Sequence, residues 1–171
     1  MTLETLWAGW RAEYVTGATA AERAAPAGDA CVFCRLAAEA EASAANGVVW
    51  RGARTFVALN AYPYASGHLL VLPQRHTDDL GDLDEAEAAE LWAAPRAALA
   101  AVTAAYAPDG ANLGANLGRA AGAGIPRHLH LHVVPRWSGD TNFMTAVGGV
   151  RVIPEEMGSA WAKLRAAWPA G

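Results

Sequence analysis

The stretch that most constrains the fold of this chain is the run His128-Leu129-His130-Leu131-His132, in which three histidines alternate with leucines. Successive side chains of a β-strand point to opposite faces, so a strand would place the three histidines on one face and the leucines on the other. The leucine face can be buried in a core, whereas buried imidazoles need hydrogen bonds or a chemical role. The run therefore predicts a strand that carries a functional site on one face.

The histidine row could serve a metal ion or a covalent reaction. Residues two apart on a strand are separated by about 6.6 Å, and the first and third histidines by about 13 Å, so one ion cannot bind all three. A metalloenzyme that uses the row as its ligands is therefore disfavoured. A neutral imidazole can instead attack phosphorus. His130 is the best candidate nucleophile, because it alone has a histidine on each side. His132, His128 and main-chain N–H groups near Gly122 and Gly124 are candidate donors to phosphate oxygens.

The remaining sequence predicts a mixture of strands and helices. Helices are expected over residues 3–15, 35–45 and 84–106, and around Met157, Trp161, Leu164 and Trp168. Pro95 should kink or divide the helix over 84–106. Strands are expected over residues 48–50, 55–59, 68–72, 112–117 and 127–136. Mainly antiparallel strands with segregated helices define the α+β class.

Length and charge limit the classes of function. With 171 residues, the chain is expected to form a single domain over 1–171, made of a helical extension (1–30), a core (31–137) and a tail with a helix (138–171). The formal net charge of −4 at pH 7 argues against a nucleic-acid partner. Neither a membrane-spanning stretch nor a signal-peptide pattern is seen, so a cytoplasmic protein without a membrane partner is expected.

The two cysteines form a Cys31-x-x-Cys34 pair, which by itself is a weak signal. Two buried thiols, half of a zinc site and a redox pair are all compatible with this spacing. The redox interpretation is disfavoured because no thioredoxin-like βαβ pattern surrounds the pair.

The motif His128-x-His130-x-His132-x-x, with an apolar residue at each x, resembles the signature of the histidine triad (HIT) superfamily of nucleotide hydrolases and transferases. Asn60 and the stretch GHLLVLPQRH over 67–76 also match. The resemblance implies a five-stranded antiparallel sheet, a homodimer built across a shared sheet, and attack on an α-phosphate to give a nucleotidyl-histidine. By position it implies that His130 is the nucleophile, that His128 and His132 flank it, and that His68 is the fourth histidine of the site. Asn60 matches a position that contacts the ribose or that fourth histidine.

A looser resemblance, to the bacterial diadenosine tetraphosphate phosphorylases, extends over nearly the whole chain. It rests on the runs NLGANLG over 112–118 and VPRWSGDTNF over 134–143 and on the N-terminal helix. It implies diadenosine tetraphosphate and inorganic phosphate as substrates, ADP and ATP as products, and a homodimer, with a tetramer as an alternative. Asn116 is a candidate contact to phosphate or ribose. Trp137 could stack on adenine, or could serve the core or a dimer interface.

The loop AGAGI over 121–125 lacks the glutamine or serine that many superfamily members place before the histidines. This departure leaves the acceptor open. With water as the acceptor the chain would be a hydrolase of dinucleoside polyphosphates, nucleoside phosphoramidates or adenylates. A nucleotide-binding protein without significant turnover, stabilised by zinc, is the alternative from another class.

Some members of the superfamily carry a zinc ion at positions that match Cys31, Cys34, His76 and His128. The resemblance therefore implies a structural zinc site at these four residues, and no organic cofactor is expected. A closed shell of four ligands would leave no position at the metal for catalysis.

Overall fold

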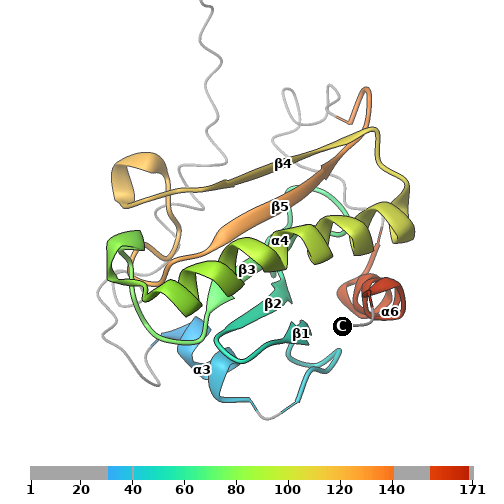
Figure 1. Ribbon diagram of the computed structural model, residues 1–171. Helices are drawn as coiled ribbons and strands as arrows, with labels where there is room; N and C mark the ends of the chain where they lie inside the picture. The colour runs from blue at the N-terminus through green and yellow to red at the C-terminus, as the bar shows by residue number, and fades with distance from the viewer. Residues whose placement is uncertain (1–30, 40, 141–154, 170–171) are drawn as a thin grey trace, which may run out of the picture.

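A computed structural model of the protein describes residues 31–39, 41–140 and 155–169, and a five-stranded sheet forms its centre (Figure 1). The strands are β1 (Val48–Arg51), β2 (Thr55–Leu59), β3 (Leu69–Pro73), β4 (Gly110–Ala115) and β5 (Leu131–Arg136). Their order in the sheet is β1-β2-β3-β5-β4, and every neighbouring pair is antiparallel. The predicted five-stranded antiparallel sheet is thereby confirmed, and β5 lies inside it between β3 and β4.

Helices cover both faces of the sheet (Figure 1). Helix α4 (Glu85–Tyr106) crosses one face, and α6 (Met157–Ala167) packs beside it near β1. Helix α3 (Val32–Ala38) lies on the opposite face. Short 3₁₀ turns occur at Leu80–Asp82 and Arg119–Ala121. None of the helices within the described residues is long and apolar enough to cross a membrane.

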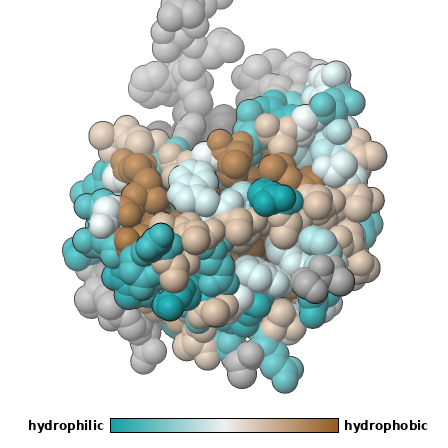
Figure 2. Space-filling model, viewed as in Figure 1, coloured by the Kyte–Doolittle hydropathy of each residue, from teal (hydrophilic) through white to brown (hydrophobic). Residues whose placement is uncertain are grey.

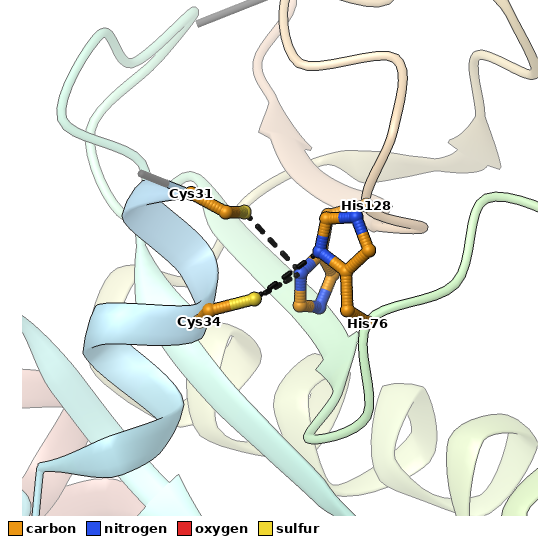
Figure 3. Close-up of side chains that lie close together, drawn as sticks. All are labelled: Cys31, Cys34, His76 and His128. Atoms are coloured by element: carbon orange, nitrogen blue, oxygen red, sulfur yellow. Dashed lines mark hydrogen bonds between the residues drawn. The ribbon is translucent and has the colours of Figure 1, made fainter. Parts of the chain in front are cut away.

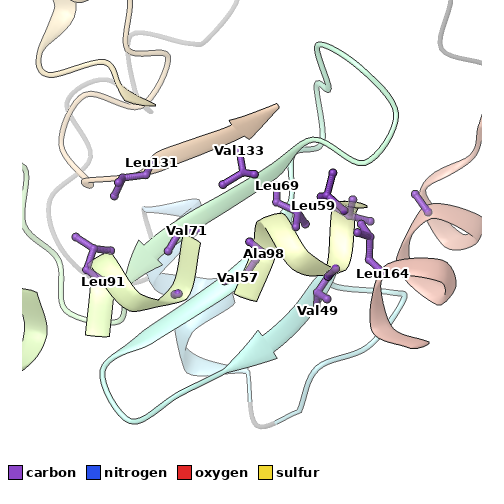
Figure 4. Close-up of a cluster of buried hydrophobic side chains, with 14 of the residues drawn as sticks. Val49, Val57, Leu59, Leu69, Val71, Leu91, Ala98, Leu131, Val133 and Leu164 are labelled. Atoms are coloured by element: carbon purple, nitrogen blue, oxygen red, sulfur yellow. The ribbon is translucent and has the colours of Figure 1, made fainter. Parts of the chain in front are cut away.

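The alternation of strand side chains divides the core into two layers. On β2, Val57 and Leu59 belong to the layer beneath α4 and α6 (Figure 4), whereas Phe56 and Ala58 belong to the layer beneath α3. Leu129, Leu131 and Val133 all lie in the α4 layer, as the apolar positions of the histidine row predict. Burial of both sheet faces places the histidines of the row on the α3 side, where they are close to the cysteines.

The strand that carries the histidine row is shorter than predicted. It begins at Leu131, so His128 and His130 precede it, and only His132 is a strand residue. The physical reason is the register: β4 and β3 pair with β5 only from Leu131 onward, while the Leu129 amide donates to the Thr77 carbonyl oxygen, outside the sheet. The alternation of the side chains nevertheless persists through the irregular segment.

Two helix predictions need comment. Pro95 does not divide α4, which is one helix of 22 residues, so of the two expected effects only the kink stays a prediction. The proline removes one ladder hydrogen bond, but the buried residues Leu91, Ala94 and Ala98 around it hold the helix on the sheet. The helix expected over 35–45 ends at Ala38, because Ser43 and Asn46 exchange side-chain and main-chain hydrogen bonds in a turn that competes with helix. The helix expected over 3–15 lies outside the described residues.

Candidate active site and metal centre

His130 lines a pocket of about 530 Å³ and is itself buried. Its Nδ1 lies 2.8 Å from the main-chain carbonyl oxygen of His128. A carbonyl oxygen can only accept, so Nδ1 carries the proton and donates it, and Nε2 is the unprotonated nitrogen of the neutral ring. Burial lowers the pKa of His130, although the hydrogen bond to His128 opposes the shift. The neutral ring is thus the favoured form at pH 7, and its Nε2 has the lone pair of a nucleophile.

His132 and His68 form a second, oppositely oriented pair. The main-chain N–H of Tyr64 donates to Nδ1 of His68 over 3.0 Å, and the Asn60 side-chain amide lies 3.3 Å from the same nitrogen. Since a main-chain N–H can only donate, the neutral His68 ring must carry its proton on Nε2. That Nε2 lies 3.0 Å from Nδ1 of His132, and so donates to it. His132 is therefore protonated on Nε2, which makes it a hydrogen-bond donor whose ring contacts that of His130.

The loop over residues 60–67 holds this pair of histidines in place. The main-chain N–H of Asn60 donates to the His68 carbonyl oxygen, and the side-chain oxygen of Asn60 accepts from the main-chain N–H of Tyr62. Gly67 has a φ of +75°, and a Cβ there would lie 2.6 Å from the Tyr106 ring. Only glycine fits this position, because both the backbone conformation and the contact with Tyr106 exclude a side chain.

Four side chains converge at a second centre, beside the pocket (Figure 3). Cys31 is the N-cap of α3, Cys34 lies in its first turn, His76 follows β3 and His128 precedes β5. Their ligand atoms all lie within 4.8 Å of one another. Nδ1 of His128 is 3.6 Å from Sγ of Cys31 and 3.7 Å from Sγ of Cys34, and Nδ1 of His76 is 3.1 Å from Sγ of Cys34. These residues could hold a metal ion.

The donor set and its supports fit a tetrahedral metal site. Zinc bonds of about 2.0–2.3 Å imply ligand atoms about 3.3–3.8 Å apart. The three separations above are close to this range, and every pair of ligand atoms lies within 4.8 Å. Nε2 of His128 lies 2.9 Å from the Pro73 carbonyl oxygen, so it carries the proton and leaves Nδ1 available as a ligand. Burial lowers the pKa of His128 to about 4, which keeps this imidazole neutral at pH 7. Burial also raises the pKa of the Cys31 thiol, so an ion must displace its proton on binding.

The position of His76 is restricted by its chain neighbour Arg75, which forms an ion pair with Glu87. Arg75 donates from Nε and Nη2 to the two carboxylate oxygens of Glu87, each over 2.8 Å. Glu87 in turn accepts from the Asp84 amide in the capping box of α4. This forked ion pair ties the segment after β3 to the start of α4, and so restricts where His76 can lie.

Phe33 lies between the two centres. Its ring centroid is 5.5 Å from that of His128 and 5.2 Å from that of His130. The ring excludes water from both imidazoles, which contributes to the burial that lowers their pKa values. Because the His128 carbonyl oxygen also accepts the hydrogen bond of the His130 ring, the four-residue centre and His130 are linked through one residue.

The structure brings most of the predicted site residues together. The pocket is lined by Asn60, Asn116, Gly122, Gly124, His130 and His132, and His68 contacts His132 from behind. Trp137 is the exception, since it does not line the pocket and its ring instead packs edge-on against Tyr106 at 6.5 Å. Its proposed stacking on adenine therefore stays a prediction.

Sequence reasoning missed several residues of the site, notably Phe33, Tyr64 and Ile125, which line the pocket, and Pro73, whose carbonyl orients His128. One signal was available for Tyr64, because it lies between two predicted site residues, Asn60 and His68. Nothing in the sequence indicates the role of the Pro73 carbonyl, because every residue has one.

With this fold and this site, the chain belongs to the histidine triad family: residues 41–139, more than half of the chain, match the HIT domain. An AP-4-A phosphorylase of Mycobacterium tuberculosis is 48% identical over 108 residues, which are 63% of this chain and 55% of that protein. The chain thus spans little more than half the length of this relative. An asymmetrical bis(5'-nucleosyl)-tetraphosphatase of Schizosaccharomyces pombe is 33% identical over 82 residues, 48% of this chain and 44% of that one.

Among solved structures, a Zn-bound histidine triad family protein from Mycobacterium smegmatis superposes with a TM-score of 0.65. It is 31% identical and covers 80% of this chain and 91% of its own. Together these likenesses place the pocket and the four-residue centre in a fold shared with proteins described as nucleotide-cleaving and as zinc-binding.

Proposed function

We propose that this protein is a nucleotidyltransferase that cleaves diadenosine tetraphosphate or a related dinucleoside polyphosphate through an adenylyl-histidine. The observation that carries the proposal is the pair of opposite tautomers in one pocket. His130 presents an unprotonated Nε2, and His132 beside it presents a protonated one. This arrangement supplies a nucleophile and a separate donor for the charge that develops on phosphate oxygens.

The reaction proceeds in two steps. The His130 Nε2 lone pair forms a bond to the α-phosphorus, and the bond from that phosphorus to the bridging oxygen breaks, so that ATP leaves with the electron pair. An oxygen of inorganic phosphate then bonds to the same phosphorus and the N–P bond breaks, which gives ADP and restores the neutral imidazole. His132 donates a hydrogen bond to the oxygens during both steps. Without this donor, the negative charge that develops on the phosphate oxygens would have no hydrogen bond from His132 to stabilise it.

The pocket supports a nucleotide as the ligand. Its volume lies within the range of about 300–1,000 Å³ that is usual for small-molecule sites. Its lining includes the apolar side chains Val32, Leu36 and Ile125, which suit a nucleobase. The lining also includes His130, His132, Asn60, Asn116 and the glycines Gly122 and Gly124, where N–H groups can approach phosphate.

Product analysis tests the proposal and separates its alternatives. The full chain is incubated with diadenosine tetraphosphate, with and without inorganic phosphate, and the products are separated by chromatography. ADP that appears only with phosphate is the expected result and identifies a phosphorylase. AMP in both samples identifies a hydrolase. This alternative is tested because the loop 121–125 has no serine or glutamine, which leaves the acceptor open. Binding without any product identifies a nucleotide-binding protein and contradicts the proposal.

We further propose zinc as the ion of the four-residue centre, with a structural role. Two thiols and two imidazoles form the Cys₂His₂ donor set that zinc prefers, and the shell is complete without a water. A bound ion would hold α3, the segment after β3 and the start of the histidine row together. Its contribution to the reaction is indirect, through the position of His128.

A homodimer is the proposed assembly, with β4 as the shared edge. All six residues of β4 are exposed. Three large apolar side chains are also exposed: Leu113 in β4, Leu117 just after it, and Trp92 in α4. Figure 2 shows separate hydrophobic spots among paler and hydrophilic residues over the upper part of the molecule, where β4 lies in Figure 1. An uncovered, uncharged edge strand readily pairs with another strand.

Light scattering should give the mass of a dimer for the full chain, and Leu113→Lys should shift it towards the monomer. A wild-type chain that is monomeric at all concentrations contradicts this assembly.

A further inference from the structure

We propose that the ring of Tyr64 is a positioning group that holds the donor His132 against the reacting phosphate, an inference that rests on the proposed function. Tyr64 lines the pocket together with His132. Its ring centroid lies 5.8 Å from that of His132, with only 22° between the ring planes. The same ring lies 4.7 Å from that of His68, and the two histidine rings are 5.2 Å apart. The three rings therefore form one packed cluster.

The hydrogen bonds of this cluster fix protons but leave ring orientation incompletely determined. The Tyr64 amide and His68 decide which nitrogen of His132 carries the proton. The hydrogen bond to Nδ1 does not by itself fix the tilt of the ring, because the terminal torsion of histidine has a broad energy well. The Tyr64 ring lies nearly parallel to the imidazole and offset from it, with the centroids 5.8 Å apart, so it limits tilting towards the tyrosine. His130 contacts His132 at 5.1 Å with 74° between the planes, so it does not provide such a face.

The consequence for the reaction is specific. A donor that stabilises charge in the transition state must be placed to well within 1 Å, and misplacement of that size reduces rates by roughly 100-fold. Loss of the Tyr64 ring should therefore reduce the rate of adenylyl-histidine formation more than it weakens the binding of nucleotide. The main-chain N–H of residue 64 remains in the alanine, leucine and phenylalanine variants, so the tautomer of His68 is unchanged in them and the effect of the ring is isolated.

The test compares full-length wild type with Tyr64→Ala, Tyr64→Leu and Tyr64→Phe. Single-turnover formation of the adduct from diadenosine tetraphosphate should slow by about 10- to 100-fold in Tyr64→Ala and Tyr64→Leu and be largely restored in Tyr64→Phe, which keeps the ring. The dissociation constant for AMP should change by less than about threefold, a small effect beside the change in rate. NMR relaxation of the His132 ring C–H groups should show increased mobility in the alanine and leucine variants only.

Three results would overturn the proposal. One is an unchanged adduct rate in both variants that lack the ring. Another is weaker AMP binding that accounts for the whole loss, which would make Tyr64 a substrate contact. The third is a His132 ring that is equally rigid without the tyrosine. The leucine variant fills the space of the ring, so it remains informative if the alanine variant does not fold. Failure of the wild type itself to form an adduct would instead refute the proposed function, while the NMR measurement still reports on Tyr64.

Discussion

Replacement of His130 by alanine is expected to abolish formation of the adenylyl-enzyme and to reduce turnover of diadenosine tetraphosphate by about 10⁴-fold or more. The reason is that no other imidazole in the pocket presents an unprotonated nitrogen: Nδ1 of His132 is already occupied by the proton of His68. The measurement is rapid quenching followed by mass spectrometry of the intact chain, which detects one added adenylyl group in the wild type.

A chemical rescue distinguishes loss of the nucleophile from loss of structure. His130→Gly leaves space for free imidazole, which should restore turnover in proportion to its concentration and give adenylyl-imidazole as a trapped product. The metal content should match that of the wild type, because His130 is not among the residues that could hold the ion. An adenylyl group attached to a residue other than His130, or full turnover by the alanine variant, would contradict the assignment.

Removal of the metal is expected to have the largest effect on stability. An ion that binds only the folded chain stabilises it by about 4 kcal/mol when its free concentration is a thousandfold above the dissociation constant. For a domain of this size that corresponds to about 8–16 °C in melting temperature. Chelation, or the Cys34→Ser substitution, should lower the melting temperature by an amount of this order. The measurement is calorimetry beside metal analysis, with one equivalent of zinc per chain expected in the wild type.

The pH dependence of metal binding follows from the thiols. Burial raises the pKa of Cys31, and zinc binds the thiolate, so binding releases a proton and affinity falls as the pH is lowered. Ser43→Ala serves as the control for Cys34→Ser, since Ser43 lies beyond α3 and forms its hydrogen bonds with Asn46 and Gly47. If the wild type contains no zinc when purified without chelators, and added zinc leaves the melting temperature unchanged, the pair is better explained as two buried thiols.

The chemical core of the site could be predicted because its information is local. Histidines at every second position share one face of any extended segment, even where it is not a regular strand. In the structure, His130 and His132 both line the pocket although β5 begins only at Leu131. The proposed ligand set was harder to derive, because Cys31 and His128 are brought together only by packing of α3 against β3 and the row. The four residues were therefore grouped only through the resemblance to a family.

Loop geometry and main-chain contacts could not be predicted. The position of the Tyr64 ring depends on how the loop between Asn60 and His68 closes, and that depends on Gly67 meeting the Tyr106 ring at the far end of α4. The partners that orient His130 and His128 are carbonyl oxygens of His128 and Pro73, which no residue type identifies. For Trp137 the sequence indicated an aromatic residue after the row, but the structure places its ring against Tyr106.

The protonation of His130 and His132 is set by main-chain groups: the His128 carbonyl for His130 and, through His68, the Tyr64 amide for His132. No substitution deletes the carbonyl, and only a proline at position 64 would delete the amide. Apolar lining residues such as Leu36 and Ile125 are not among these groups, so under the proposed function they could change without altering the protonation of either histidine. Such separation would favour evolutionary change of substrate preference, and it would let protein engineers vary the apolar lining while the proposed nucleophile and donor stay intact.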